Sequence, residues 1–211
     1  MKSPQQGLAL PTLMVMLSVA SLATLLAMRN LWVNDQLLNA DADHLRSQLL
    51  AEAVLPTAVR DITDLSATAH SLSEATPNLR HTMGSPEQTH AFFPVSMSEY
   101  DVLRQRLGSS VCLAGICAPV LPSTWTKASD WKAQTATAMT VSVTDSPYAT
   151  STARYWIEVF PQETTHTFVY RITALATGVL PVSTTVLQAI WTRNTPTSTT
   201  GQWHSWQILH D

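Results

Sequence analysis

The chain has 211 residues, 45% of them hydrophobic, and a formal net charge of −3 at pH 7. A chain of this length can bury one sizeable core outside a membrane but hardly two. Charged residues make up only 13% of it, against roughly 25% in an ordinary globular domain. Lys and Arg form no cluster, which argues against a nucleic-acid-binding surface. A Ser- and Thr-rich chain with so little charge indicates an extracytoplasmic protein rather than a cytosolic enzyme.

The N-terminal segment is a short polar stretch followed by a long uncharged one. Met1 to Gln6 precede Gly7, and the 21 residues from Leu8 to Met28 carry no charge before Arg29. As a helix this run would span about 31 Å, close to the ~30 Å hydrocarbon core of a bilayer. A cut after Gly7 would leave the apolar helix on the mature protein, whereas a signal peptidase would remove it. This layout resembles that of a type IV prepilin.

Two other interpretations of the N-terminal segment compete with this one. An ordinary membrane anchor would show the same features, and the flanking cations Lys2 and Arg29 give only a weak orientation. A conventional signal peptide would use small residues such as Ala20 or Ala23 as its cleavage site, but the apolar run continues past them. The segment by itself leaves the prepilin and the plain anchor open.

The sequence after Arg29 becomes amphipathic. No helix-stopping residue occurs before Pro56, a proline that we expect to kink the helix. We therefore predict one continuous helix with a membrane half at residues 8–30 and an amphipathic half at residues 31–65. The apolar residues of the second half recur at mostly helical spacing: Leu31, Leu38, Leu45, Leu49 and Ala53.

The remainder of the chain, residues 66–211, is predicted to form a globular domain. Residues 66–150 are expected to be a loop region, since prolines and glycines break its first part and no period is sustained. Residues 151–211 are expected to form an antiparallel meander, because β-branched and aromatic runs follow one another through short links. The fold class is therefore α+β. The expected strands are Arg154–Phe160 and Thr167–Ala174 as a hairpin, Ser183–Arg193, and a last edge strand at Trp203–Leu209.

The chain has two cysteines, Cys112 and Cys117. Four residues separate them, and Gly115 near the centre allows the chain to fold back so that the sulfurs meet. An exported domain would hold them as a disulfide. A redox dithiol more often has two intervening residues, and a metal site needs further ligands. We predict a disulfide that pins a surface loop ahead of the strands.

These pieces, in this order, resemble a PilX-type minor pilin of the type IV pilus assembly machinery. The resemblance covers most of the chain outside residues 60–110. It implies a type IV pilin-like fold, in which the long N-terminal helix packs on a C-terminal antiparallel sheet. The segments that carry it are Gln48–Leu55, similar to the family's Gln-Ala-Ala-Glu-Ala-Ala-Leu stretch; Cys112–Cys117 with Pro119, Pro122 and Trp125 behind it; Tyr155–Glu158 and Tyr170–Ala174; and Val186–Gln188 with Arg193.

The resemblance implies two successive locations for the protein, the inner membrane and the pilus. Residues 1–7 would be a prepilin leader, the protein would be single-pass in the inner membrane with a periplasmic C-terminal domain, and it would later join a pilus. Its partners would be prepilin peptidase, other minor pilins and the major pilin, without a cofactor and without nucleic acid. The alternative functions are a membrane-anchored periplasmic adhesion or binding module and a K-type pseudopilin of a secretion system.

One residue departs from the pattern of the major pilins. They carry a glutamate five residues into the mature chain, which answers the N-terminal ammonium of a neighbouring subunit. After a cut at Gly7 that position is Thr12. A hydroxyl cannot neutralise an ammonium in lipid, where an uncompensated charge is costly. The departure favours a minor subunit at the filament tip or in an initiation complex.

No residue set indicates catalysis. The seven histidines lack ligand spacing, and the sequence contains neither a Gly-x-Ser-x-Gly elbow nor a Gly-rich phosphate loop. His81 and His90 near Glu87 are more simply surface residues of a loop. Trp203 and Trp206 are most simply packing residues, with a carbohydrate- or surface-binding face as a minority interpretation. We therefore predict a non-enzymatic protein without a metal site.

The leader hypothesis has a direct test. We expect prepilin peptidase to cut between Gly7 and Leu8 and Leu8 then to be N-methylated, which mass spectrometry of the mature N-terminus measures. Substitution of Gly7 should block the cut, whereas a plain anchor would be unaffected. Retention of Met1, or a cut between Ala20 and Ala27, would contradict the prepilin interpretation.

Overall fold

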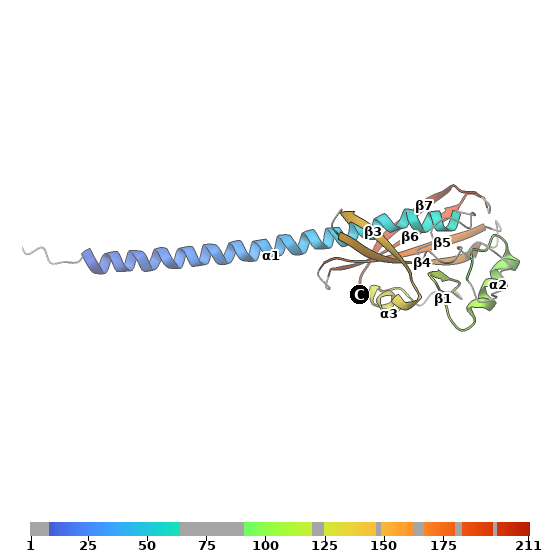
Figure 1. The fold of residues 1–211 in the computed structure, drawn as a ribbon, viewed down its shortest axis with the longest axis horizontal. Coiled ribbons are helices and arrows are strands. Elements are labelled where there is room, and N and C mark those ends of the chain that lie inside the picture. The colour runs from blue at the N-terminus through green and yellow to red at the C-terminus, as the bar shows by residue number, and fades with distance from the viewer. Residues whose placement is uncertain are drawn as a thin grey trace, which may run out of the picture. The chain divides into compact units, whose positions relative to one another are not determined.

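The computed structural model describes residues 9–63, 91–119, 125–146, 149–162, 167–179, 183–195 and 198–211. The chain divides into two compact units, Met1–Ala42 and Asp43–Asp211. A single helix, α1 (Ala9–Thr63), supplies the described part of the first unit and the first element of the second (Figure 1). The predicted continuous helix is confirmed. Its 55 residues include Pro56, so the proline interrupts the hydrogen-bond ladder without ending the helix.

The second unit is built on a seven-stranded sheet with the order β1-β2-β4-β5-β6-β7, in which β3 pairs with β4 beside β2. The predicted hairpin and the antiparallel meander from β4 to β7 are confirmed. The strands are β1 (Cys112–Leu113), β2 (Ile116–Cys117), β3 (Met139–Ser146), β4 (Ala149–Gln162), β5 (Thr167–Thr177), β6 (Thr184–Arg193) and β7 (Gly201–Leu209). One pairing was not predicted: β2 runs parallel to β4, with Ile116 opposite Ile157.

The expected loop region 66–150 is wrong for most of its described residues. It contains the helices α2 (Met97–Leu107) and α3 (Ala128–Ala133), a 3-10 turn at Thr135–Thr137, and strands β1 to β3. The spacing of Ser96 and Glu99 is a helix-start signal that sequence reasoning missed. In the structure, the Ser96 hydroxyl accepts a hydrogen bond from the Glu99 amide, and the Glu99 carboxylate accepts one from the Val95 amide. The sheet also begins earlier than residue 151, at β3, because Met139–Ser146 pairs along β4.

The sheet of the second unit has a hydrophobic cluster on each face. On one face, the C-terminal part of α1 packs with buried residues of β4 to β6, among them Tyr155, Ile172 and Leu187. On the other face, α3 and the β1–β2 hairpin cover Trp156, whose ring centroid lies 5.1 Å from that of Trp131. Alternation along the strands produces both clusters, since neighbouring residues of a strand point to opposite faces.

The cysteines form the predicted disulfide, with their Cα atoms 4.1 Å apart. They do not pin a surface loop, however. Cys112 and Cys117 are paired across β1 and β2 and retain only 2% and 0% of their exposure, because they pack against Trp131 and Trp156. The bridge therefore belongs to the smaller core.

The hairpin between the cysteines turns through Ala114 and Gly115, whose φ angles are +49° and +77°. A two-residue turn with both φ angles positive matches the twist of the strands on either side. Gly115 adopts its positive φ without strain, and it is enclosed: its amide donates to the Thr137 carbonyl at 2.7 Å, and its carbonyl accepts from the Ile157 amide at 2.7 Å. A Cβ at Gly115 would lie 2.8 Å from the Cβ of Met139.

Two substitutions in this turn should have different effects on stability. Gly115→Ala should lower the free energy of unfolding by about 2 kcal/mol or more, because it adds a steric clash to the cost of a positive φ. Ala114→Gly should change it by less than about 1 kcal/mol, because relief of the positive φ is offset by the greater freedom of glycine in the unfolded chain. Urea denaturation of the full chain, followed by tryptophan fluorescence, measures both. Equal effects would contradict the packing argument.

Candidate membrane-spanning and assembly segment

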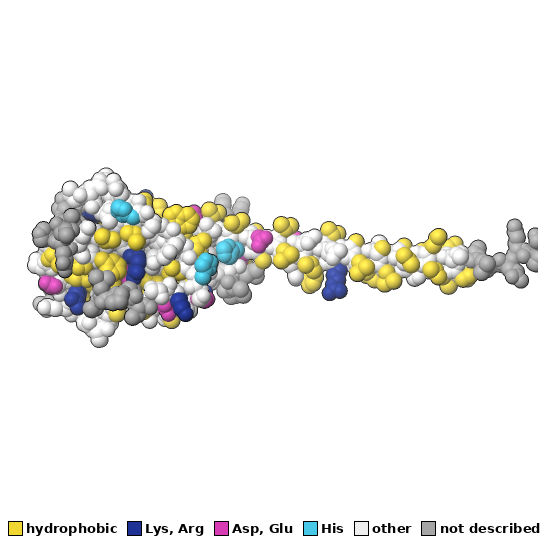
Figure 2. Space-filling view, turned by 180° about the vertical axis from the view of Figure 1, so that it is seen from behind, with side chains coloured by type: hydrophobic (Ala, Val, Ile, Leu, Met, Phe, Trp, Pro, Cys, Tyr) yellow, Lys and Arg dark blue, Asp and Glu magenta, His cyan; other side chains and the backbone are white. Residues whose placement is uncertain are grey.

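The first unit exposes apolar side chains all around α1. The large hydrophobic side chains from Leu10 to Met28 are each 60–74% exposed, and they cover the N-terminal part of the helix in Figure 2. The most apolar stretch has a mean hydropathy of 2.0 and none of it is buried. A helix that is apolar on every side needs an apolar solvent or partner on every side. Within the described residues, this is the helix long and apolar enough to cross a membrane.

Hydroxyl groups inside the apolar run are satisfied by the helix itself. Ser18 donates to the Val15 carbonyl and Ser21 to the Leu17 carbonyl, each at 2.8 Å. Thr24 donates to the Ser21 carbonyl, also at 2.8 Å. Local bonds of this kind remove the cost of an unpaired polar group in hydrocarbon. These three residues therefore do not weaken the apolar character of the segment.

The polar end of the segment begins at Arg29. Trp32, one turn later, is 63% exposed, and tryptophan is enriched where a helix leaves the bilayer. Beyond it, an Asn39 side-chain amide donates to Asp35 at 3.4 Å on the exposed surface of the helix. A cation, an indole and then exposed polar groups form the usual sequence at a membrane–water boundary.

The predicted processing residues fall at the limit of the structure. Gly7 and Leu8 lie outside the described residues. Thr12 lies near the start of α1 with its side chain exposed, and the first turn of this helix contains no acidic residue. No carboxylate therefore occupies this end of the helix in the described part of the chain.

In the second unit, polar bonds fix α1 to the sheet at both ends of its packed segment. Sequence reasoning missed these residues. The bonds are Val179 amide to Asp43 Oδ1, 2.7 Å; Ser47 Oγ with Thr185 Oγ1, 2.7 Å; Tyr155 hydroxyl to Asp61 Oδ2, 2.8 Å; and Arg193 Nη2 to the Ile62 carbonyl.

A buried ion pair lies on the face of the sheet opposite α1. Glu158 has no exposed surface, and Arg171 on the neighbouring strand donates to both of its carboxylate oxygens at 2.5 and 2.7 Å. The guanidinium also lies 5.1 Å from the ring centroid of Phe160. A bidentate pair of this kind satisfies the carboxylate, but removal of one partner would leave a buried charge. The pair gives Glu158 a structural role between β4 and β5.

The described residues assemble no evident catalytic or metal-binding group. No three His, Cys, Asp or Glu side chains among them lie close enough to hold a metal ion, and the cysteines are joined as a disulfide. His81, His90 and Glu87 lie outside the described residues. Burial raises the pKa of Tyr170 and so favours the neutral phenol. The positive charge of Arg193 partly opposes this increase.

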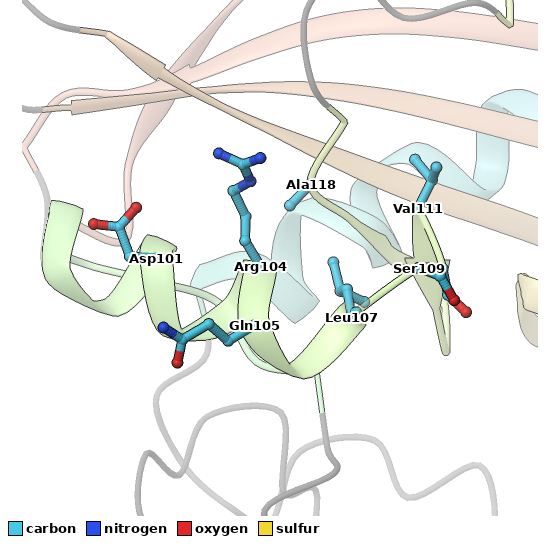
Figure 3. Close-up of a pocket in the computed structure, with 9 residues that line it drawn as sticks. Asp101, Arg104, Gln105, Leu107, Ser109, Val111 and Ala118 are labelled. Atoms are coloured by element: carbon cyan, nitrogen blue, oxygen red, sulfur yellow. The ribbon is translucent and has the colours of Figure 1, made fainter.

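A polar cavity of about 600 Å³ runs along α2. Asp101 and Arg104 extend from the helix toward the side on which Ala118 lies, whereas Gln105 points away from it (Figure 3). Its remaining walls are short or apolar side chains. One exposed cation beside one exposed anion gives the cavity no selective charge, so it defines no ligand.

Comparison with known proteins adds no assignment. No family model, no curated protein and no solved structure matches the chain.

The bond between Asp43 and Val179 predicts a difference between two neighbouring aspartates. Asp43→Ala should lower the free energy of unfolding by about 1–3 kcal/mol, because it removes the hydrogen bond that the buried Asp43 carboxylate accepts from the Val179 amide. Asp41→Ala, two residues earlier on the exposed helix surface, should change it by less than about 0.5 kcal/mol. Urea denaturation of both full-length variants measures the difference, and equal effects would show that the bond is not stabilising.

Proposed function

We propose that this protein is a PilX-like minor pilin that takes part in the assembly or initiation of a type IV pilus, at or near the filament tip. The observation that carries the proposal is the double use of α1. Its N-terminal part is apolar and exposed on all sides, and its C-terminal part supplies the core of an α+β unit with a mainly antiparallel sheet. A helix of this kind can lie in a membrane before assembly and in a helix bundle afterwards.

The chemistry at the start of α1 supports a minor subunit. In a filament, each subunit's N-terminal ammonium enters apolar surroundings beside a subunit added earlier. Without a carboxylate at position 12, this subunit cannot form an ion pair with the N-terminal ammonium of a subunit added before it, and a charge in apolar surroundings stays uncompensated. Insertion at or near the start of the filament avoids the mismatch. The partners would be other minor pilins and the major pilin, with prepilin peptidase acting first on the leader.

A non-enzymatic role agrees with the buried polar groups. Asp43, Asp61 and Glu158 all bond to neighbouring elements of the second unit, where they fix the helix or the strands. The protein would serve as an assembly component in the inner membrane with its second unit in the periplasm, and later in the pilus.

The proposal predicts few copies per filament. Deletion of the gene should reduce the number of pili, and quantitative mass spectrometry of purified fibres should find this protein far below the major pilin. Immunogold label should lie at filament ends. Amounts comparable to the major pilin, or label spread evenly along the fibres, would contradict the proposal.

Thr12→Glu tests the reason for this scarcity. A carboxylate at position 12 should ease incorporation along the shaft and raise the copy number in fibres. The matched control is Thr24→Glu, which adds the same charge elsewhere in the apolar run and should lower membrane insertion without raising incorporation. If the Thr12→Glu protein stays as scarce as the parent, Thr12 is not what limits this subunit.

A further inference from the structure

The part of α1 that follows the uncharged run carries leucines that no described residue of the chain covers. Leu31, Leu38 and Leu45 are spaced seven residues apart, and each is 60–69% exposed. Polar neighbours such as Asn34 and Asp41 place this stretch beyond the run that suits the interior of a bilayer. Large apolar side chains left open at a constant interval indicate an interaction surface.

An interval of seven residues is that of a coiled-coil seam. In the heptad abcdefg, apolar residues at positions a and d face a neighbouring helix. When the three leucines are placed at d, the a positions between and beside them are also apolar, with Asp35 as the exception. The exposed seam consists of Met28, Leu31, Leu38, Ala42, Leu45 and Leu49.

The seam is not the side of α1 that packs on the sheet. Ser47 and Leu50 are buried in the second unit, whereas Leu45 and Leu49 in the same turns are 60% and 65% exposed. With 3.6 residues per helical turn, the two stripes are separated by roughly 150° around the helix axis. A helix that packs on the seam would therefore not compete with the sheet for the same side chains.

The apolar run of the same helix fixes the direction of a partner. Two copies anchored in one membrane through this run enter it in the same orientation, so their α1 helices lie parallel. In a parallel pair, each seam residue meets its own counterpart. Leucine then lies against leucine at all three d positions, an arrangement typical of two-stranded coiled coils. The seam thus fits a second copy of the chain in register.

The residues that flank the seam are complementary to themselves in such a pair. A residue at position g lies beside the residue five positions later, at e, on the other helix. Asn34 would meet Asn39 of the second copy, and Asp41 would meet Arg46 of the second copy. The guanidinium has five N–H donors, so this contact is compatible with bonds of Arg46 within its own chain. Each contact occurs twice, because the pair is symmetric.

Asp35 weakens the same pairing. It occupies an a position, so a symmetric pair brings two like charges together. The Asn39 amide on the same helix donates to Asp35 Oδ2 at 3.4 Å, which leaves the charge in place. An apolar seam with one repulsive position suits a reversible pair better than a permanent one.

We propose that two copies of this chain pair in parallel through the exposed seam of α1, between Met28 and Leu49. The pairing goes beyond the proposed assembly role and does not depend on it. It requires only that two copies share a membrane, because the seam and its flanking charges belong to the chain itself.

Sedimentation equilibrium of the full chain in density-matched detergent micelles tests the pairing. We expect a reversible monomer–dimer equilibrium. Leu38→Asp should weaken the dimer by about tenfold or more, because it adds two facing carboxylates to the seam. The matched control is Leu37→Asp. Leu37 is 59% exposed but lies off the seam, so the same charge there should change the dissociation constant by less than about twofold.

Two further variants test the register. Asp35→Asn keeps the shape of the side chain and removes the repulsion, so it should tighten the dimer by about fivefold or more. Under mild oxidation, Leu38→Cys should form a disulfide between two chains, and Leu37→Cys should form far less of it.

Three outcomes would overturn the proposal. The first is a parent protein that stays monomeric at every concentration measured. The second is an equal effect of Leu38→Asp and Leu37→Asp, which would assign the dimer to unspecific apolar contact or to the membrane run. The third is an Asp35→Asn dimer no tighter than that of the parent, which would show that position 35 does not face its counterpart.

Discussion

The structure depends on one helix that must satisfy two kinds of surroundings along its length. From Leu10 to Met28 no part of α1 is buried, so its apolar side chains remain available to lipid or to other helices. From Leu50 to Ile62 one stripe of the same helix is buried against the sheet. The change from all-round to one-sided apolarity occurs without a break in the backbone. Other features of the second unit follow from the need to hold that stripe in place.

Hydrophobic contact alone would not fix the position of α1 along the sheet, since apolar surfaces can slide. Directional hydrogen bonds between α1 and the sheet domain fix this position. Asp43 and Asp61 lie 18 residues apart on α1, and each bonds to a different part of the sheet domain. Arg193 reaches the Ile62 carbonyl near the end of the helix, where carbonyls lack helical partners. Buried polar groups of this kind are costly when unpaired, so they select one register.

The strands of the sheet differ in how far their two faces are covered. β4 to β6 have both faces occupied, one by α1 and the other in part by α3 and the disulfide hairpin. β7 has neither face fully covered, and its bulge turns two indoles in one direction. Edge strands usually carry charges or prolines that discourage contact. β7 carries neither charges nor prolines.

The sequence by itself determined the features that depend on local pattern. The uncharged run before Arg29, the lack of a helix stop between Met28 and Leu55, and the β-branched and aromatic runs of β4 to β6 each extend over many residues. They therefore predicted the helix, the α+β class and the meander. The Cys112–Cys117 spacing, with Gly115 near its centre, likewise predicted the disulfide. Shorter elements such as α2 gave weaker signals and were assigned to a loop.

Only the tertiary structure decided which polar residues are buried, because partners such as Asp61 and Tyr155 are 94 residues apart in the sequence. It also decided the parallel pairing of β2 with β4, which depends on where the disulfide hairpin docks. The common face of Trp203 and Trp206 is a third example. Their spacing of three places them on opposite faces of a regular strand, and only the register against β6 reveals the extra residue. Local pattern fixes which elements form, but contacts between distant segments determine what each side chain meets.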